Sequence, residues 1–375
     1  MKNVRADRAL FLGGFPDAAL PSKIARGLHP RIEYLEFLHT NPARAMSFQE
    51  AQESQSLIVR SVGRLAGPYW SLAMLGRLRR GLSHALVTGE DLGFPMALIQ
   101  MLTGGSMPIS IVTHGSFLAS RKGTWVLQAL RGASQVQFLC LSESLRQQLI
   151  QQHHLPEDRV FTVGYGVDTC FFQPDPLTSV KSRQIAAGGM ANRDYQTLTA
   201  AMDGLNVEAK IAADSSWFRT DLDIAGKQLP PNVEARSYGD YVGLRRLYAE
   251  SACVVVPLYE AVHACGYAVI AEAMAMGKPV ITTRIKGQSD YIIEGETGFY
   301  VPPGNVQALR ARILQLVDDP NLAQRLGQNA RSLILEKYTL AAYNGRVAEA
   351  LDLKAPDTKT MGRKGLRSWV NDVRK

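Results

Sequence analysis

The stretch His263-Ala-Cys-Gly-Tyr-Ala-Val-Ile-Ala-Glu-Ala-Met-Ala-Met-Gly-Lys-Pro-Val-Ile-Thr-Thr283 decides how this chain folds. The β-branched run Val254-Val-Val just before it predicts a buried parallel strand. Gly266 then opens a helix that Gly277 and Pro279 end, and the apolar residues after Pro279 predict the next strand. Strand, helix and strand in this order form a βαβ unit, which is typical of an open α/β sheet.

Glu272 is the one carboxylate inside this small and apolar helix. It falls in the second turn and shares its face with Ala268, while Val269 and Ile270 are available for the core. A helix N-terminus that faces the carboxyl end of a parallel strand is a natural anion site. A carboxylate close to such a site can accept hydrogen bonds from a sugar diol.

Both halves of the chain carry short apolar runs separated by helical stretches, which predicts parallel βα units. The expected strands are residues 10–12, 32–38, 85–88, 109–112 and 136–141, then 184–187, 208–212, 233–237, 253–256 and 280–282. Pro174 and Pro176 mark the hinge between the two sets. We therefore expect an α/β fold with domains at residues 1–175 and 176–340, and a final helix and basic tail at 341–375.

Several motifs resemble the GT-B glycosyltransferases, and among them the large retaining group called family 4. The matching positions are Glu272, Ala273, Met274, Ala275, Gly277, Pro279 and Val280, followed by GQSDYIIEGETGFYVPPG from Gly287 to Gly304. Further similar segments are LSESLR from Leu141, VGYGVDTCFFQP from Val163, and Arg193-Asp-Tyr195.

The resemblance implies two Rossmann-like α/β/α domains that face a central cleft. It implies that the first domain binds the acceptor and the second the donor. The reaction that it implies is transfer of a sugar from a nucleotide sugar, usually a UDP-sugar, to a hydroxyl acceptor with retained anomeric configuration. The acceptor stays open, and a lipid-linked compound is one candidate.

The chain departs from the pattern of that family at two positions. The family carries a loop Glu eight positions before the helix Glu, and Ala264 stands there in this chain. A second Arg often follows the first glycine of the turn after the first donor-domain strand, where this chain has Gly189. Candidate replacements for the lost contacts are the amides of Gly266 and Tyr267, the side chains of Glu260 and His263, and the cations Lys181 and Lys286. For Glu260 and His263 the alternative is ordinary loop polarity.

In such a transfer, the largest contribution to catalysis is expected from cations and oriented amides that point at the leaving phosphate. Arg193 is the leading cation because it follows the strand at 184–187 and its glycine turn. The resemblance implies that Glu272 holds the ribose and that His114 lies by the reacting carbon. The alternatives are an ordinary surface Arg at a helix start and a structural His. The expected donor-binding residues are Gly188, Gly189, Glu260, His263, Cys265, Gly266, Tyr267, Ala268 and Glu272.

Ligands bind at the carboxyl ends of strands in open α/β sheets, so residues after the strands of the first half are acceptor candidates. These are Gly13, Gly14, Phe15, Glu90, Asp91 and Gly115. Asp221-Leu-Asp223 resembles the metal-binding Asp-x-Asp of another glycosyltransferase fold, but no apolar strand precedes it. We therefore expect transfer without a metal and no cofactor besides the donor.

The 375 residues include 42 Lys and Arg against 34 Asp and Glu, a formal charge of +8. The basic residues do not alternate with aromatics as in RNA-binding modules, so nucleic acid is not expected as a partner. Basic clusters at 57–80 and in the tail at 354–375 resemble surfaces that lie on anionic lipid. The simpler alternative is a solvated helix face and a frayed terminus.

The sequence shows no apolar leader, no stretch near the ~20 residues of a spanning helix, and no metal-ligand spacing among its four cysteines. We therefore expect a cytoplasmic protein, peripheral at the inner face of the membrane if the basic clusters bind lipid. The two departures leave open a catalytically weak nucleotide-binding or scaffold protein. A nucleotide-sugar epimerase or a non-glycosidic coupling enzyme of the same fold is a third reading. A Rossmann dehydrogenase is excluded because no GxGxxG turn follows the first strand.

Overall fold

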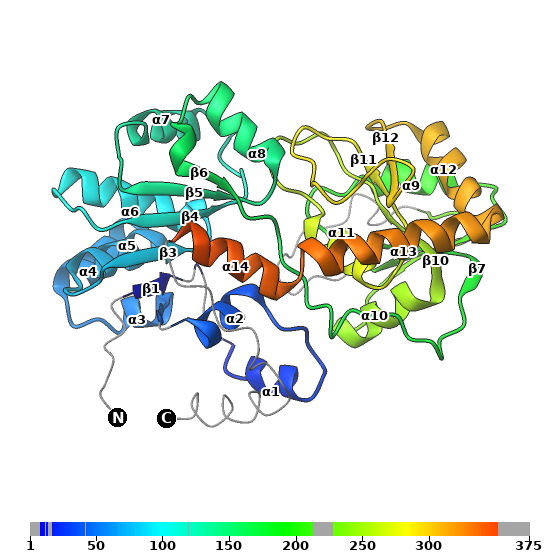
Figure 1. The fold of residues 1–375 in the computed structure, drawn as a ribbon, viewed down its shortest axis with the longest axis horizontal. Coiled ribbons are helices and arrows are strands. Elements are labelled where there is room, and N and C mark those ends of the chain that lie inside the picture. Colours follow the sequence, from blue (N-terminus) through cyan, green and yellow to red (C-terminus); the bar gives the residue numbers. More distant parts are fainter. Residues whose placement is uncertain are drawn as a thin grey trace. The chain divides into compact units, whose positions relative to one another are not determined.

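In the computed structural model, which describes residues 8–11, 13, 17–41, 43–118, 120–212 and 228–351, the strands form two separate sheets. Each sheet has six strands, every pair of neighbours is parallel, and helices flank both sheets (Figure 1). This arrangement confirms the α/β prediction.

The first sheet has the strand order β2-β1-β3-β4-β5-β6. Its strands are β1 (Arg8–Phe11), β2 (Ala43–Met46), β3 (His84–Val87), β4 (Ile109–Thr113), β5 (Val136–Cys140) and β6 (Val160–Thr162). The helices of this half are α1 (Leu20–Ala25), α2 (Glu33–Thr40), α3 (Phe48–Gln52), α4 (Leu57–Ala66), α5 (Pro68–Leu78), α6 (Glu90–Leu102), α7 (Arg121–Leu130) and α8 (Glu143–Gln147), with short turns η1 (Gln148–Gln152) and η2 (Glu157–Arg159).

The second sheet has the strand order β12-β11-β10-β7-β8-β9. Its strands are β7 (Lys181–Gly188), β8 (Glu208–Ala212), β9 (Val233–Arg236), β10 (Ser251–Val256), β11 (Val280–Thr283) and β12 (Gly298–Val301). The helices are α9 (Tyr195–Met202), α10 (Tyr241–Glu250), α11 (Tyr267–Ala275), α12 (Val306–Asp318), α13 (Pro320–Lys337) and α14 (Leu340–Ala350).

The strand expected at 32–38 is wrong, because residues 33–38 fall in the helix α2. Its sequence EYLEFLHT fits strand and helix spacing about equally, and short apolar runs are ambiguous for this reason. Glu33 and Glu36 in the first turn favour the helix through its dipole. The strand of this region is the short β2, and the two other strands that we did not predict, β6 and β12, lie like it at sheet edges.

The helix α12 shows how the second core is built. The Asn305 side chain accepts a hydrogen bond from the Ala308 amide at 2.9 Å and so caps the helix start. The face that follows buries Leu309, Ile313, Leu316 and Val317, as the spacing predicts. These side chains join strand residues such as Val255 and Ile281 in one cluster.

Contacts divide the chain into two compact units. The N-terminal unit holds the described residues up to Pro21, Glu33–Gly164, and those from Asn344 on. The C-terminal unit holds Ser22–Ile32 and Tyr165–Tyr343. The expected domain borders at residues 175 and 340 come from the sequence pattern, whereas these two units are defined by contacts between residues.

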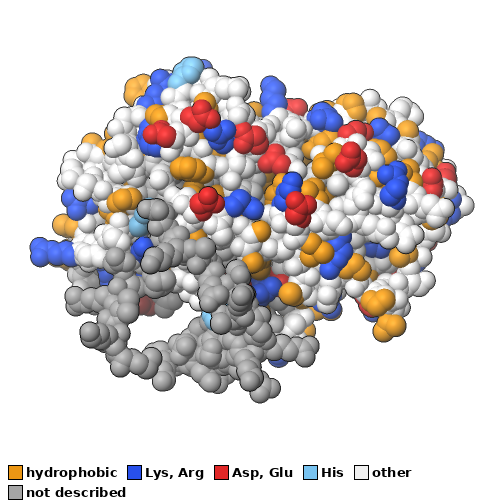
Figure 2. Space-filling model, in the orientation of Figure 1, with side chains coloured by type: hydrophobic (Ala, Val, Ile, Leu, Met, Phe, Trp, Pro, Cys, Tyr) orange, Lys and Arg blue, Asp and Glu red, His pale blue; other side chains and the backbone are white. Residues whose placement is uncertain are grey.

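No helix in the described ranges is long and apolar enough to cross a bilayer. On the face drawn in Figure 2, basic and acidic side chains of the described residues are intermixed. The positive charge of the chain is therefore not gathered into one patch on that face.

Candidate functional site

The order of the second sheet reverses at β7, with β8 on one side and β10 on the other. Ligands of open α/β sheets bind at such a reversal, beyond the carboxyl ends of the strands. Two loops meet there, since the Asp194 amide donates to the Pro257 carbonyl at 3.1 Å and the Tyr259 amide to the Asn192 carbonyl at 3.3 Å. The fold thus brings together the expected residues that follow β7 and those that follow β10.

Arg193 is buried and holds the loop after β7 in shape. Its Nε donates to the Gly188 carbonyl at 2.8 Å and its Nη1 to the Ala191 carbonyl at 2.7 Å. Its Nη2 donates to no described residue and lies against Gly189, where a Cβ would collide with the guanidinium. Gly189 also has a φ of +87°, which disfavours any side chain. A side chain at position 189 would therefore meet the Arg193 guanidinium.

Glu272 of α11 is buried at 8 % exposure. Burial raises the pKa of its carboxyl to about 8, and the nearby charge of Arg193 acts in the opposite direction. Among the described residues, no group donates a hydrogen bond to this carboxyl. A carboxyl that no protein group pairs keeps its oxygens available to accept hydrogen bonds.

Tyr248 of α10 supplies a second unsatisfied group that the sequence did not reveal. Its hydroxyl is buried and has no hydrogen-bond partner among the residues that the structure describes. The oxygen lies 3.0 Å from the place that a Cβ on Gly188 would take, so it faces the glycine turn. Burial, then the neighbouring Glu272 and Tyr195, raise the pKa of this hydroxyl. No motif marks Tyr248, which reads as a core residue of an amphipathic helix.

The start of α11 is fixed by its glycine and by Tyr267. Gly266 has a φ of +77°, and a Cβ there would lie 2.9 Å from Val256 Cγ1. The Tyr267 hydroxyl lies 2.9 Å from the Gly287 carbonyl and 2.7 Å from the Gln288 carbonyl, which ties the helix start to a neighbouring loop. These contacts orient the first turn of α11, whose leading amides have no acceptor inside the helix.

The remaining donor candidates lie on the same loop. Cys265 is buried, which raises the pKa of its thiol to about 11, and Ala268 is half-buried. Glu260 is exposed and accepts a hydrogen bond from the Lys286 amide at 2.9 Å, so it helps to hold two loops together. His263, which directly precedes Ala264, is half-buried.

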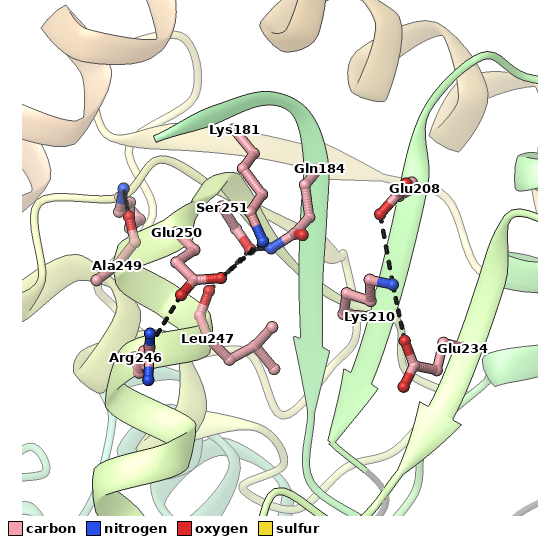
Figure 3. Close-up of polar contacts among 11 residues, drawn as sticks. Lys181, Gln184, Glu208, Lys210, Glu234, Arg246, Leu247, Ala249, Glu250 and Ser251 are labelled. Carbon is pink, nitrogen blue, oxygen red and sulfur yellow. Dashed lines mark hydrogen bonds and ion pairs between the residues drawn. The ribbon is translucent and has the colours of Figure 1, made fainter. Parts of the chain in front are cut away.

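Lys181 does not supply the missing cation, contrary to expectation. It is the first residue of β7, whereas Gly188 is the last, and each strand residue adds ~3.3 Å. Its Nζ pairs with Glu250 at 2.9 Å, as Figure 3 shows. Lys286 follows the carboxyl end of β11 and remains a candidate.

The first sheet reverses at β1, with β2 on one side and β3 on the other. The Gly13 amide donates to Thr88 Oγ1 at 3.3 Å across this point. His114, just after β4, is exposed, and its Nε2 lies 3.2 Å from the Thr88 carbonyl. The structure therefore gathers Gly13, Thr88 and His114, while Gly14 and Phe15 lie outside the described residues.

Glu90 is a buried residue of this edge that acts on the backbone. Its Oε1 accepts a hydrogen bond from the Gly115 amide at 2.5 Å, which fixes the loop that carries His114. Asp91 is exposed. Glu33 is a residue that we missed: burial raises the pKa of its carboxyl and the nearby His114 lowers it. Its stretch was expected to be a strand, so its place beside His114 could not be foreseen.

The described residues hold no group of three or more His, Cys, Asp and Glu that could bind a metal ion. Asp221 and Asp223 lie outside the described residues. Transfer without a metal therefore stays a prediction.

Comparisons with known proteins agree with the glycosyltransferase resemblance of the sequence motifs. Residues 218–333 match the family described as "Glycosyl transferases group 1". An alpha-D-kanosaminyltransferase of Streptomyces kanamyceticus is 24% identical over 317 residues, 74% of this chain and 80% of that protein. The D-rhamnosyltransferase WbpZ of Pseudomonas aeruginosa is 24% identical over 310 residues, covering 74% and 76%.

Among solved structures, HepE of Anabaena in complex with UDP and glucose is similar with a TM-score of 0.68 and 17% identity. The match covers 92% of this chain and 99% of that one, and at this identity it speaks for the fold. Together these findings identify the chain as a glycosyltransferase with the GT-B fold.

Proposed function

We propose that the enzyme is a retaining glycosyltransferase that moves a sugar from a nucleotide sugar to a hydroxyl acceptor without a metal ion. One observation carries the donor part of this proposal. At the reversal of the second sheet, Arg193 Nη2 and the Glu272 carboxyl lie near the start of α11, and neither forms a hydrogen bond with a described residue. Uridine is the proposed base, and the UDP bound by HepE supports it.

Each group has a proposed role on the donor. Arg193 Nη2 and the first amides of α11 would neutralise the diphosphate, since a helix start attracts anions. Glu272 would accept hydrogen bonds from the ribose hydroxyls. The carbon–oxygen bond to the leaving phosphate breaks while the bond to the acceptor oxygen forms on the same face, and a phosphate oxygen takes the acceptor proton.

His114 is proposed to lie by the reacting carbon, and Gly13 and Asp91 to meet the acceptor. These residues belong to the N-terminal unit. The kinetics of their variants test the assignment. A loss of transfer in His114→Ala with unchanged UDP binding would support it. Equal kinetics for His114→Ala and the wild type would refute it.

Parallel thermal melts with UDP, GDP and ADP test the donor. Binding to the native state alone raises the melting temperature by mass action, and we expect the largest rise with UDP. Incubation with a panel of nucleotide sugars, glycolipid extracts and EDTA then tests transfer and metal need. NMR of the product distinguishes retained from inverted configuration. Failure to bind any nucleotide would overturn the proposal.

Ala264 favours a second candidate, a nucleotide-binding protein with weak or no catalysis. The residue is half-buried and brings no polar group to the sugar side of the loop. This candidate expects a melting shift with UDP but no turnover of any nucleotide sugar. Turnover in the same preparation would exclude it.

The proposed compartment is the cytoplasm. All four cysteines are free thiols, at Cys140, Cys170, Cys253 and Cys265. Free thiols are usual in a reducing compartment. Fractionation of cells that make the tagged protein tests this placement.

A further inference from the structure

The helix α4 packs through a narrow face. The Ser56 side chain caps its start by accepting from the Val59 amide at 3.4 Å. Val59 is fully buried, and its carbonyl accepts a hydrogen bond from Ser71 Oγ of α5 at 3.0 Å. One turn later Gly63 lets α5 approach, since a Cβ there would lie 3.0 Å from Ser71 Oγ. The contact with α5 therefore uses only one side of α4.

The outer face of α4 carries large apolar side chains that are exposed to solvent. Leu57 is 72% exposed, Ile58 56% and Leu65 89%. At 100° per residue these three positions fall within an arc of about 100°. Exposed leucines are common singly, but three large apolar side chains on one short helix form a patch that suits a partner.

Two arginines border this patch. Arg60 and Arg64 are exposed, one turn apart, and their side chains form no ion pair or hydrogen bond with the described residues. The stretch 57–80 contains five arginines and no acidic residue. Arg77 and Arg79 are engaged with Thr103 and Glu50, and Arg80 is an exposed residue beyond the end of α5. Within α4 itself, both arginines lack a partner among the described residues.

We propose that α4 is a membrane-binding helix that lies in the interface of an anionic bilayer. Leu57, Ile58 and Leu65 would enter the boundary between head groups and acyl chains, and Arg60 and Arg64 would contact lipid phosphates. An apolar arc with arginines on its border is the pattern of interfacial helices. The absence of acidic residues from 57–80 complements anionic lipid. The proposal adds a partner to the proposed function and uses none of its donor residues.

Sedimentation of the full chain with lipid vesicles tests this surface. We expect binding to vesicles that contain phosphatidylglycerol and much weaker binding to phosphatidylcholine alone. Because each cation near an anionic surface contributes ~1 kcal/mol, Arg60→Gln with Arg64→Gln should lower the partition coefficient roughly 25-fold. Leu57→Ser with Leu65→Ser should reduce binding to both kinds of vesicle.

The matched control is Leu177→Ser with Leu335→Ser, which removes two exposed leucines of the C-terminal unit. This variant should bind vesicles like the wild type. A UDP melting shift in every variant shows that the fold and the donor site are intact. The proposal is overturned if the α4 variants sediment like the wild type. It is also overturned if α4 instead joins two copies of the chain, seen as a dimer without vesicles that the leucine variant abolishes.

Discussion

The reversal points of the two sheets differ in how completely their polar groups are paired. In the N-terminal unit, Glu90 accepts from the Gly115 amide and His114 lies at hydrogen-bond distance from the Thr88 carbonyl. In the C-terminal unit, the Tyr248 hydroxyl is buried without a hydrogen-bond partner among the described residues, and the carboxyl of the buried residue Glu272 accepts no hydrogen bond from them. Among the described residues, the first edge therefore pairs these polar groups within the protein, whereas the second leaves two of them without a protein partner.

This difference suggests that the two units bind their ligands in different ways. A buried group without a partner has lost its hydrogen bonds to water. A ligand that supplies a hydrogen bond offsets this loss. Such a site favours one ligand class strongly. A paired and more exposed edge can accept varied partners, which suits the side of a transferase that meets the acceptor.

The largest effect is expected from Arg193→Ala. Loss of one preorganised donor to a developing charge commonly lowers the rate by about 100- to 1,000-fold. We expect this loss in kcat for sugar transfer, measured by release of the nucleoside diphosphate. Arg183→Ala, which removes an exposed arginine paired with Asp318, is the control and should keep its rate. A rate close to that of the wild type in Arg193→Ala would place the phosphate cation elsewhere, with Lys286 as the next candidate.

The second-largest effect is expected in how the free energy of unfolding depends on pH. The folded chain holds the pKa of Glu272 at about 8 against an ordinary 4.5, so it keeps the proton to higher pH than the unfolded chain. The free energy of unfolding should therefore fall as pH rises from about 4.5 to about 8. Urea titrations across this range should show a steeper fall for the wild type than for Glu272→Gln. Parallel curves would mean that the carboxyl is already ionised in the folded state.

Glu90→Ala probes the paired edge. It leaves the Gly115 amide without its acceptor, which should cost about 1–3 kcal/mol of unfolding free energy. Asp91→Ala, at the exposed neighbouring position, should change it by less than about 0.5 kcal/mol. Urea unfolding measures both, and equal effects of the two variants would contradict the role assigned to Glu90.

Tyr248→Phe should have the smallest effect on the free protein. Its hydroxyl makes no hydrogen bond, so unfolding free energy should stay the same or rise. UDP should bind about fivefold more weakly, because a hydrogen bond to the ligand contributes about 1 kcal/mol. Tyr195→Phe is the contrast, since its hydroxyl donates to the Gly189 carbonyl at 2.6 Å and its loss should destabilise the free protein. Unchanged UDP affinity in Tyr248→Phe would show that the hydroxyl stays unused.

The donor side of the molecule was largely predictable because its signals are local in sequence. β-branched runs mark β10 and β11, and Gly266 and Gly277 mark the ends of α11. Arg193 was found from its place after a strand and a glycine turn. Each of these signals follows from backbone conformation or burial within a few residues.

The remaining parts depend on contacts between distant segments. Tyr248 reaches the glycine turn from another helix, and Glu33 reaches His114 from a stretch that fits strand and helix alike. The edge strands β2, β6 and β12 are short and carry little pattern of their own. The collision between Gly189 and the Arg193 guanidinium became visible only with the loop conformation in hand.

The division of the chain into units has a consequence for its synthesis. Residues from Asn344 on group with the N-terminal unit, and Arg346 donates to the Val163 carbonyl at 2.7 Å. Because translation proceeds from the N-terminus, the whole C-terminal unit is synthesised before these residues are made. The half of the protein that is encoded first is therefore completed last. A stop codon in place of the Asn344 codon would remove part of the N-terminal unit and leave every residue of the C-terminal unit in the product.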